Sequence, residues 1–382
     1  MTSLGLYIHI PFCRSRCIYC DFYSTTLPET WQMRYVEALR REMEMVQSRA
    51  MRLSADGLST LYIGGGTPSL LSPHALRLLF EFVERNFTLQ PQAEVTIEAN
   101  PDDVTAEWVS RLRDTPVNRI SMGVQSLDDD ILRTLRRRHT AGQARQAVGL
   151  LHRAGYTNLS MDLIYGLPGQ TRAQFGADVR EVLSMGVPHL SAYALQFEEG
   201  TPLAEMKRQG TVDEADEELS LSCYLQLLDL TQEAGLEHYE ISNFARPGFH
   251  SRHNSSYWTG APYLGLGAGA HSYDGERTRS FNCADVRAYV EAINQGRLPS
   301  EAEVLSEKER YDERVMLSLR TSQGLSLTAI GRDFGPAMRR HCECMAQPHL
   351  HAGRLQKKPD ETLCLTRQGL FVSDDIISDL MA

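Results

Sequence analysis

Residues 6–22 read LYIHIPFCRSRCIYCDF, a short apolar run that leads into a loop with three cysteines. An apolar run of this length, rich in Ile, Leu and Tyr, predicts a buried strand. Helical periodicity begins soon after the loop, over residues 30–47. The stretch therefore predicts a strand, a loop and a helix in that order, which is the first unit of an α/β fold.

The same order of strand, loop and helix repeats along the N-terminal half of the chain. Further strand candidates lie at residues 60–64, 94–99, 119–124, 159–165 and 189–195. Amphipathic helices separate them, as at residues 72–87, where Ser72 is the expected N-cap and Pro73 the first helical residue. Six such units predict a partial (β/α)6 barrel, because a closed barrel of this kind has eight.

Polar and glycine-rich segments follow the predicted strands at the ends where barrel enzymes place their reactive groups. They are Cys13, GGGTP at 64–68, EANP at 98–101, GVQS at 123–126, and Asp162 with GLPGQT at 166–171. One glycine-rich loop alone is most often a turn. Several in order at successive strand ends predict one shared site.

The pattern changes after about residue 205, and the chain divides into three predicted domains. Residues 1–205 form the barrel. Residues 206–304 form an α/β extension with a long helix at 213–235, a strand at 238–242 and a loop at 248–272 that contains HNSSYW. Residues 305–382 combine helices with a hairpin at 354–369, which predicts a small helical, winged-helix-like module for packing rather than DNA binding.

Composition restricts the partners that this chain is expected to have. The chain has 382 residues, of which 42% are hydrophobic and 23% charged, with a formal net charge of −10. That charge argues against a protein that holds nucleic acid through its backbone phosphates. No apolar run has membrane-spanning length, and the N-terminus lacks the pattern of a secretory signal. We therefore expect a cytoplasmic protein whose thiols stay reduced.

Cys13, Cys17 and Cys20 have the spacing C-x3-C-x2-C. A structural zinc site would require a fourth ligand. A [4Fe–4S] cluster usually takes four thiolates, so three leave one iron open to a small molecule with oxygen and nitrogen donors. The other cysteines are scattered, and we expect structural roles for them: Cys223, Cys283, Cys342, Cys344 and Cys364.

The cysteine motif resembles that of the radical S-adenosylmethionine superfamily, C-x3-C-x-aromatic-C, with Tyr19 as the aromatic residue. YIHIPFC, GGGTP, NRISMGVQS and MDLIYGLPGQT are similar to one branch of that superfamily. The branch contains oxygen-independent coproporphyrinogen III oxidase and the radical S-adenosylmethionine haem chaperones. The resemblance extends from Tyr7 to about His271.

The resemblance implies that Cys13, Cys17 and Cys20 hold a [4Fe–4S] cluster. It implies contacts to S-adenosylmethionine for Tyr7, Tyr19, Gly65, Gly66, Thr67, Glu98, Gln125, Arg137 and Asp162. Glycine permits close backbone approach, carboxylates accept hydrogen bonds, and an arginine can fork onto a carboxylate. Each polar residue also has a simpler interpretation: Asp162 caps a loop, Arg137 is a solvated helix charge, and Gln125 fastens a turn.

Three features bear on the choice between oxidase and chaperone. The oxidase motif continues to a further cysteine, where this chain has Phe22, and the oxidase has a long arm where only six residues precede Tyr7. HNSSYW at 253–258 matches the chaperone motif H-N-x-x-Y-W, which implies that His253 holds haem. The alternative is that His253 and Asn254 stabilise a turn while Tyr257 and Trp258 fill the core. His271 is a weaker candidate.

The resemblance therefore implies a haem chaperone with a [4Fe–4S] cluster and S-adenosylmethionine as cofactors and haem as cargo. Its implied partners are haem-accepting apo-proteins, including membrane respiratory enzymes, without nucleic acid, and a homodimer is consistent with such a carrier. The alternative is an enzyme that oxidatively decarboxylates coproporphyrinogen III. A third interpretation is a radical enzyme for an unrelated small molecule, with HNSSYW structural.

Overall fold

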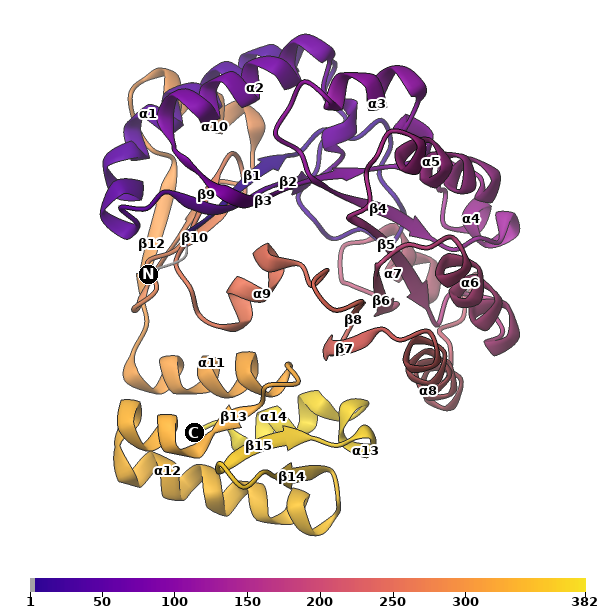
Figure 1. The fold of residues 1–382 in the computed structure, drawn as a ribbon, viewed down its shortest axis with the longest axis vertical. Coiled ribbons are helices and arrows are strands. Elements are labelled where there is room, and N and C mark those ends of the chain that lie inside the picture. The colour runs from indigo at the N-terminus through magenta and orange to yellow at the C-terminus, as the bar shows by residue number, and fades with distance from the viewer. Residues whose placement is uncertain (1–3) are drawn as a thin grey trace.

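The computed structural model describes residues 4–382, so the first three residues of the predicted barrel domain lie outside it. A curved sheet forms the body of the molecule (Figure 1). Its centre consists of parallel strands that neighbour one another in sequence order. They are β1 (Leu4–Ile10), β2 (Leu58–Gly65), β3 (Leu89–Ala99), β4 (Arg119–Gln125), β5 (Leu159–Tyr165) and β6 (His189–Ala194). This order confirms the predicted α/β fold.

Helices cover the outer, convex face of these strands (Figure 1). They are α1 (Thr30–Leu53), α2 (Pro73–Asn86), α3 (Ala106–Leu112), α4 (Asp129–Thr134), α5 (Ala141–Arg153) and α6 (Arg172–Ser184), with the 3-10 turns η1 (Pro68–Leu70) and η2 (Pro101–Asp103). Ser72 caps α2 as predicted, because its side chain accepts a hydrogen bond from Ala75 N–H and Pro73 begins the helix. The largest hydrophobic cluster lies between these helices and the sheet.

Residues 202–304 add strands to both edges of the same sheet. On one edge β9, β10, β11 and β12 follow β1, and on the other β8 and β7 follow β6. The elements are α7 (Pro202–Arg208), α8 (Glu217–Glu233), β7 (Glu237–Glu240), β8 (Asn243–Ala245), α9 (Arg252–Trp258), β9 (Tyr263–Leu266), β10 (His271–Tyr273), β11 (Thr278–Asn282), α10 (Val286–Asn294) and β12 (Ser300–Val304). The domain boundaries at 205 and 304 remain predictions.

The segment at 248–272 is not the loop that the sequence predicts. It contains helix α9, which carries HNSSYW, and strand β9. Ser251 caps the helix by accepting a hydrogen bond from Asn254 N–H. Glu94 then accepts hydrogen bonds from the backbone N–H groups of Arg252 and His253, at 3.0 and 2.9 Å. The prediction failed because a carboxylate distant in sequence satisfies the first turn of this short helix.

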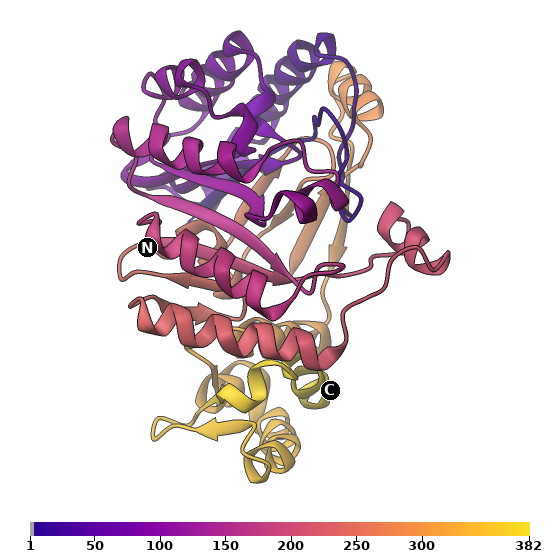
Figure 2. The ribbon, with the colours of Figure 1, turned by 90° about the vertical axis from the view of Figure 1, so that its right-hand side faces the viewer.

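The C-terminal elements form a compact module at one end of the molecule, drawn in orange and yellow (Figure 2). They are α11 (Glu307–Leu319), β13 (Leu325–Ser326), α12 (Leu327–His351), β14 (Leu355–Lys357), β15 (Thr362–Leu365), α13 (Arg367–Leu370) and α14 (Ser373–Leu380). The predicted hairpin is present as the antiparallel pair β14–β15. A separate hydrophobic cluster, which includes Tyr311, Leu327 and Ile376, forms the core of the module. Every helix within residues 4–382 is too short or too polar to span a lipid bilayer.

Candidate functional site

The loop after β1 brings its three cysteines to one cavity of about 190 Å³, which we call the cluster cavity; Cys13, Cys17 and Cys20 line it. Backbone hydrogen bonds shape the loop, from Cys13 N–H to Thr25 O at 2.9 Å and from Cys20 N–H to Cys17 O at 3.3 Å. The Cys13 thiol lies 3.4 Å from the Thr67 hydroxyl. The three cysteines thus line one cavity.

The GGGTP segment forms the second wall of the cluster cavity at the end of β2. Gly65 has φ +111°, a conformation that side-chain-bearing residues rarely adopt. A Cβ atom on Gly66 would lie 2.7 Å from the Pro11 carbonyl carbon, and one on Gly64 would lie 2.9 Å from the Glu98 carboxylate. Glycine is therefore required here by the close approach of Pro11 and of the Glu98 side chain.

Two carboxylates from β3 and β5 line the same cavity. Glu98 accepts hydrogen bonds from the Tyr62 hydroxyl at 2.7 Å and from Gly65 N–H at 3.0 Å. Burial raises the pKa of Glu98, and these hydrogen bonds oppose the rise. Burial likewise raises the pKa of Asp162 to about 6. Both groups can accept hydrogen bonds from an ammonium group or from hydroxyls.

Arg137 connects the cysteine loop to the end of β4. It donates hydrogen bonds to Cys17 Sγ at 3.2 Å, to Asn100 Oδ1 at 2.9 Å and to the Gly123 carbonyl. Arg137 Nε and His139 Nδ1 are buried without a partner among residues 4–382, and both residues line the cluster cavity. An unpartnered buried polar atom is costly: Arg137 Nε lacks an acceptor, whereas Nδ1 of the neutral His139 ring, whose Nε2 donates to the Val124 carbonyl at 3.0 Å, lacks a donor.

The structure brings together nearly all of the residues that the resemblance assigns to S-adenosylmethionine. The cluster cavity is lined by Tyr19, Gly65, Gly66, Thr67, Glu98, Gln125, Arg137 and Asp162. Gln125 has φ +69°, so the end of β4 is strained at this cavity. Tyr7 instead lines a neighbouring cavity, where its hydroxyl lies 2.9 Å from His9 Nδ1.

Sequence reasoning missed several residues of the cluster cavity. Ser121, Arg138 and His139 line it, and Tyr62 orients Glu98. Asn100, which orients Arg137, lies within the EANP segment that was predicted to face the site. In the sequence, Tyr62 is marked as near the site only by its position in the predicted strand at residues 60–64. His139 carries no such signal, because it follows three arginines that read as a solvated helix end.

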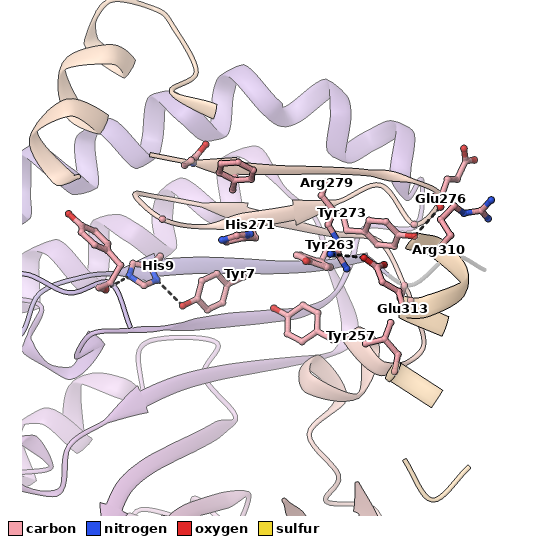
Figure 3. Close-up of a pocket in the computed structure, with 18 of the residues that line it drawn as sticks. Tyr7, His9, Tyr257, Tyr263, His271, Tyr273, Glu276, Arg279, Arg310 and Glu313 are labelled. Carbon is pink, nitrogen blue, oxygen red and sulfur yellow. Dashed lines mark hydrogen bonds and ion pairs between the residues drawn. The ribbon is translucent and has the colours of Figure 1, made fainter. Parts of the chain in front are cut away.

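A second, larger cavity of about 820 Å³ adjoins the first, and we call it the large cavity (Figure 3). β1, α9, β9, β10, β11 and α11 contribute to its wall, so residues far apart in sequence meet there. Phe22, of which 68% is exposed, lines both cavities. Aromatic rings form much of the wall: Tyr7, Tyr257, Tyr263, Tyr273, Phe281 and Phe334.

His253 of HNSSYW lies behind this wall and is 1% exposed. Its Nδ1 lies 2.8 Å from Thr60 Oγ1, and its Nε2 lies 2.8 Å from the hydroxyl of Tyr257, which lines the large cavity. Burial, with a smaller effect from Arg119, lowers the pKa of His253 to about 3, so the ring is neutral. Trp258 points elsewhere and stacks beneath the Arg320 guanidinium.

Comparison with known proteins identifies the family. Residues 7–182 match the radical SAM superfamily, and residues 305–372 match the HemN C-terminal domain. The "Heme chaperone HemW" of Mycobacterium tuberculosis H37Rv is 37% identical over 386 residues, which cover 99% of this chain and 94% of that protein. The chain belongs to the HemW family of radical SAM proteins. The HemW of Bacillus subtilis is 32% identical over 374 residues and 97% of each chain.

A solved structure agrees with the HemW assignment at the level of fold. The coproporphyrinogen III oxidase HemN from Escherichia coli superposes with a TM-score of 0.85 and 22% identity. The superposition covers 100% of this chain and 90% of that chain. At this identity the likeness concerns the fold alone, and it includes the C-terminal module.

Radical SAM membership brings a [4Fe–4S] cluster and S-adenosylmethionine in general, and the cluster cavity of this HemW relative fits both. The three thiols, the glycine backbone, the carboxylates of Glu98 and Asp162 and the residues Arg137 and His139 all line this cavity. Within residues 4–382, no group of three or more His, Cys, Asp or Glu side chains is placed so that it could hold a single metal ion. The thiols would hold the cluster, and the polar wall would hold S-adenosylmethionine.

Proposed function

We propose that this chain binds haem and delivers it to haem-dependent proteins, using a [4Fe–4S] cluster and S-adenosylmethionine. The observation that carries the proposal is the large aromatic cavity beside the cluster cavity in a chain of the HemW family. Its volume of about 820 Å³ lies within the roughly 300–1,000 Å³ of small-molecule and cofactor sites. Aromatic rings suit the faces of a porphyrin.

We propose that the residues of the cluster cavity hold and orient S-adenosylmethionine. When bound, the cluster and S-adenosylmethionine supply one-electron chemistry. Glu98 and Asp162 would accept hydrogen bonds from the amine or hydroxyls, and the Arg137 guanidinium would lie beside the carboxylate. Gly65, Gly66 and Thr67 permit close approach, while Tyr19 and Gln125 complete the wall.

The finer parts of the proposal concern place and partners. We propose a cytoplasmic carrier whose acceptors are apo-proteins that include membrane respiratory enzymes, and whose exposed cargo site favours a homodimer. His253 is proposed to act in haem binding. Tyr7 lines the large cavity, where we place haem, and not the cluster cavity.

An anaerobic haem titration of the cluster-reconstituted chain, followed by Soret absorbance, tests the proposal. We expect one haem per chain and weaker binding by His253→Ala. The matched control is His351→Ala, an exposed histidine of α12, which should bind as the wild type does. Absence of specific haem binding in the wild type would refute the carrier function. Coproporphyrinogen III turnover under reducing conditions would then favour the oxidase alternative.

A further inference from the structure

Two histidines line the large cavity, and a third stands behind its wall. His9 lines it, but its ring nitrogens lie 2.9 Å from the Tyr7 hydroxyl and from the Tyr23 carbonyl. Both nitrogens of His253 are likewise hydrogen-bonded, and the ring is buried. His271 alone lines the cavity with both ring nitrogens unbonded among residues 4–382, and its side chain is exposed to the cavity.

The backbone of His271 is held firmly although its ring is free. It pairs with Phe281 across β10 and β11, and the two rings lie 5.6 Å apart. The turn before it is bound to α1, because buried Glu42 accepts hydrogen bonds from Gly267 N–H at 2.8 Å and from Asn282 at 2.6 Å. A fixed strand that presents a free imidazole is suited to ligation.

The contacts of the candidate ligands also favour His271. Both of its ring nitrogens are free of hydrogen bonds among residues 4–382, so an imidazole lone pair is available to a ligand in the cavity. Cys283 lines the same cavity, but its thiol donates a hydrogen bond to the Asp285 carbonyl at 3.8 Å.

The far end of the large cavity carries charges of both signs, because Glu276 and Glu313 line it together with three arginines. Figure 3 shows Arg279 and Arg310 on the side away from His9. Arg279 is paired with Glu313 at 2.6 Å, and Arg314 with Asp333 at 3.2 Å. Arg310 has no ion-pair partner in the described part of the chain and lies over the Phe334 ring. It is therefore available to a carboxylate of a ligand.

We propose that haem lies in the large cavity with His271 as an axial ligand of its iron and Arg310 beside a propionate. This inference rests on the proposed haem-carrier function and names the site that performs it. A neutral imidazole is a normal axial ligand of haem iron. His253 then acts as a positioning residue, because its hydrogen bond holds the Tyr257 hydroxyl at the cavity wall.

The test compares wild type, His271→Ala, His253→Ala and His351→Ala, each full-length and cluster-reconstituted, in anaerobic haem titrations. His271→Ala should weaken haem binding by more than about tenfold, since loss of even an outer-shell partner of a metal ligand costs that much. Added imidazole should restore the wild-type Soret position in His271→Ala but not in His253→Ala. Loss of the wild-type Soret position in Cys283→Ser but not in His271→Ala would overturn the assignment by making Cys283 the ligand.

The haem titrations distinguish the ligand assignment from the carrier function. A wild-type Soret position and affinity in His271→Ala would overturn the ligand assignment while leaving the carrier function intact. If His271→Ala binds haem more weakly and added imidazole does not restore binding, the ligand assignment is also overturned, because a structural role of His271 would explain the loss. A wild type that binds no haem would instead refute the proposed function.

A second set of variants tests Arg310. Arg310→Ala should weaken binding of haem but not of its dimethyl ester, which lacks the carboxylates. The control Arg340→Ala changes an exposed arginine of α12 and should affect neither ligand. Equal weakening for haem and ester in Arg310→Ala would remove the propionate contact from the proposal.

Discussion

At the scale of single residues, each cysteine of the loop after β1 supplies one thiol to the same cavity. Replacement of Cys13, Cys17 and Cys20 together by serine should abolish iron binding, because thiolates are the ligands of such clusters. Iron per chain and the brown absorbance of anaerobically reconstituted protein measure this. Cys344→Ser, an exposed cysteine of α12, should keep the wild-type iron content. A [4Fe–4S] spectrum in the triple variant would contradict the assignment.

His253 should also make the stability of the chain depend on pH. In the folded chain its pKa is lowered to about 3, whereas in the unfolded chain it protonates near its ordinary pKa of about 6.5. The unfolded state therefore takes up a proton as the pH falls through 6.5, and stability that is present above that pH is lost below it.

Urea unfolding at pH 7 and pH 5 measures this effect. Between these values the unfolding free energy of the wild type should fall by about 2 kcal/mol more than that of His253→Gln. His351→Gln changes an exposed histidine and should follow the wild type. Parallel pH profiles for the wild type and His253→Gln would show that His253 is not held neutral.

At the scale of elements, helix α1 holds the turn between β9 and β10 through one buried carboxylate. Glu42 accepts hydrogen bonds from Gly267 N–H, from Asn282 and from the Tyr289 hydroxyl, the last at 2.6 Å. Tyr35 supports the same turn, because its hydroxyl accepts from Ala268 N–H at 2.9 Å. These contacts tie the first helix of the chain to a turn more than two hundred residues away.

Glu42→Ala should lower the unfolding free energy by roughly 2–4 kcal/mol, because it leaves buried donors without an acceptor. Glu44→Ala is the matched control on the same helix. Its carboxylate is about half exposed and pairs with Arg40 on the surface, so its loss should cost less than about 0.5 kcal/mol. Urea unfolding measures both, and equal effects would show that the buried network is not stabilising.

The elements differ in how far their sequence predicts them. Strand β5 occupies the predicted residues 159–165, and α2 begins at the predicted Ser72 cap, because both signals are local. Helix α9 was missed, since Glu94 satisfies its first turn from another part of the chain. Short strands such as β10 and β8 carry too few residues for a period to be visible.

At the scale of the whole molecule, the two cavities are separate and share Phe22 as a boundary. We therefore expect S-adenosylmethionine and haem to bind at the same time. At a concentration of S-adenosylmethionine about one hundred times its Kd, strict competition would raise the haem Kd roughly one hundredfold. If the two sites are separate, the haem Kd should instead reach a constant value as the concentration of S-adenosylmethionine rises. Haem titrations at increasing S-adenosylmethionine distinguish the two outcomes.

The sequence by itself determined the order of β/α units and the cysteine loop. It also placed polar groups at successive strand ends, where the structure brings Glu98, Gln125, Arg137 and Asp162 into one cavity with the cysteines. These features could be predicted because parallel strands align their carboxyl ends at one edge of the sheet.

Only the tertiary structure decided what the second half of the chain contributes. It joined β9–β12 and β7–β8 to opposite edges of one sheet and set α11 beside β10 and β11 around the large cavity. It also buried His253 behind Tyr257 while leaving His271 free. The physical reason is that burial and hydrogen-bond partners depend on segments far apart in sequence, which no local pattern of residues records.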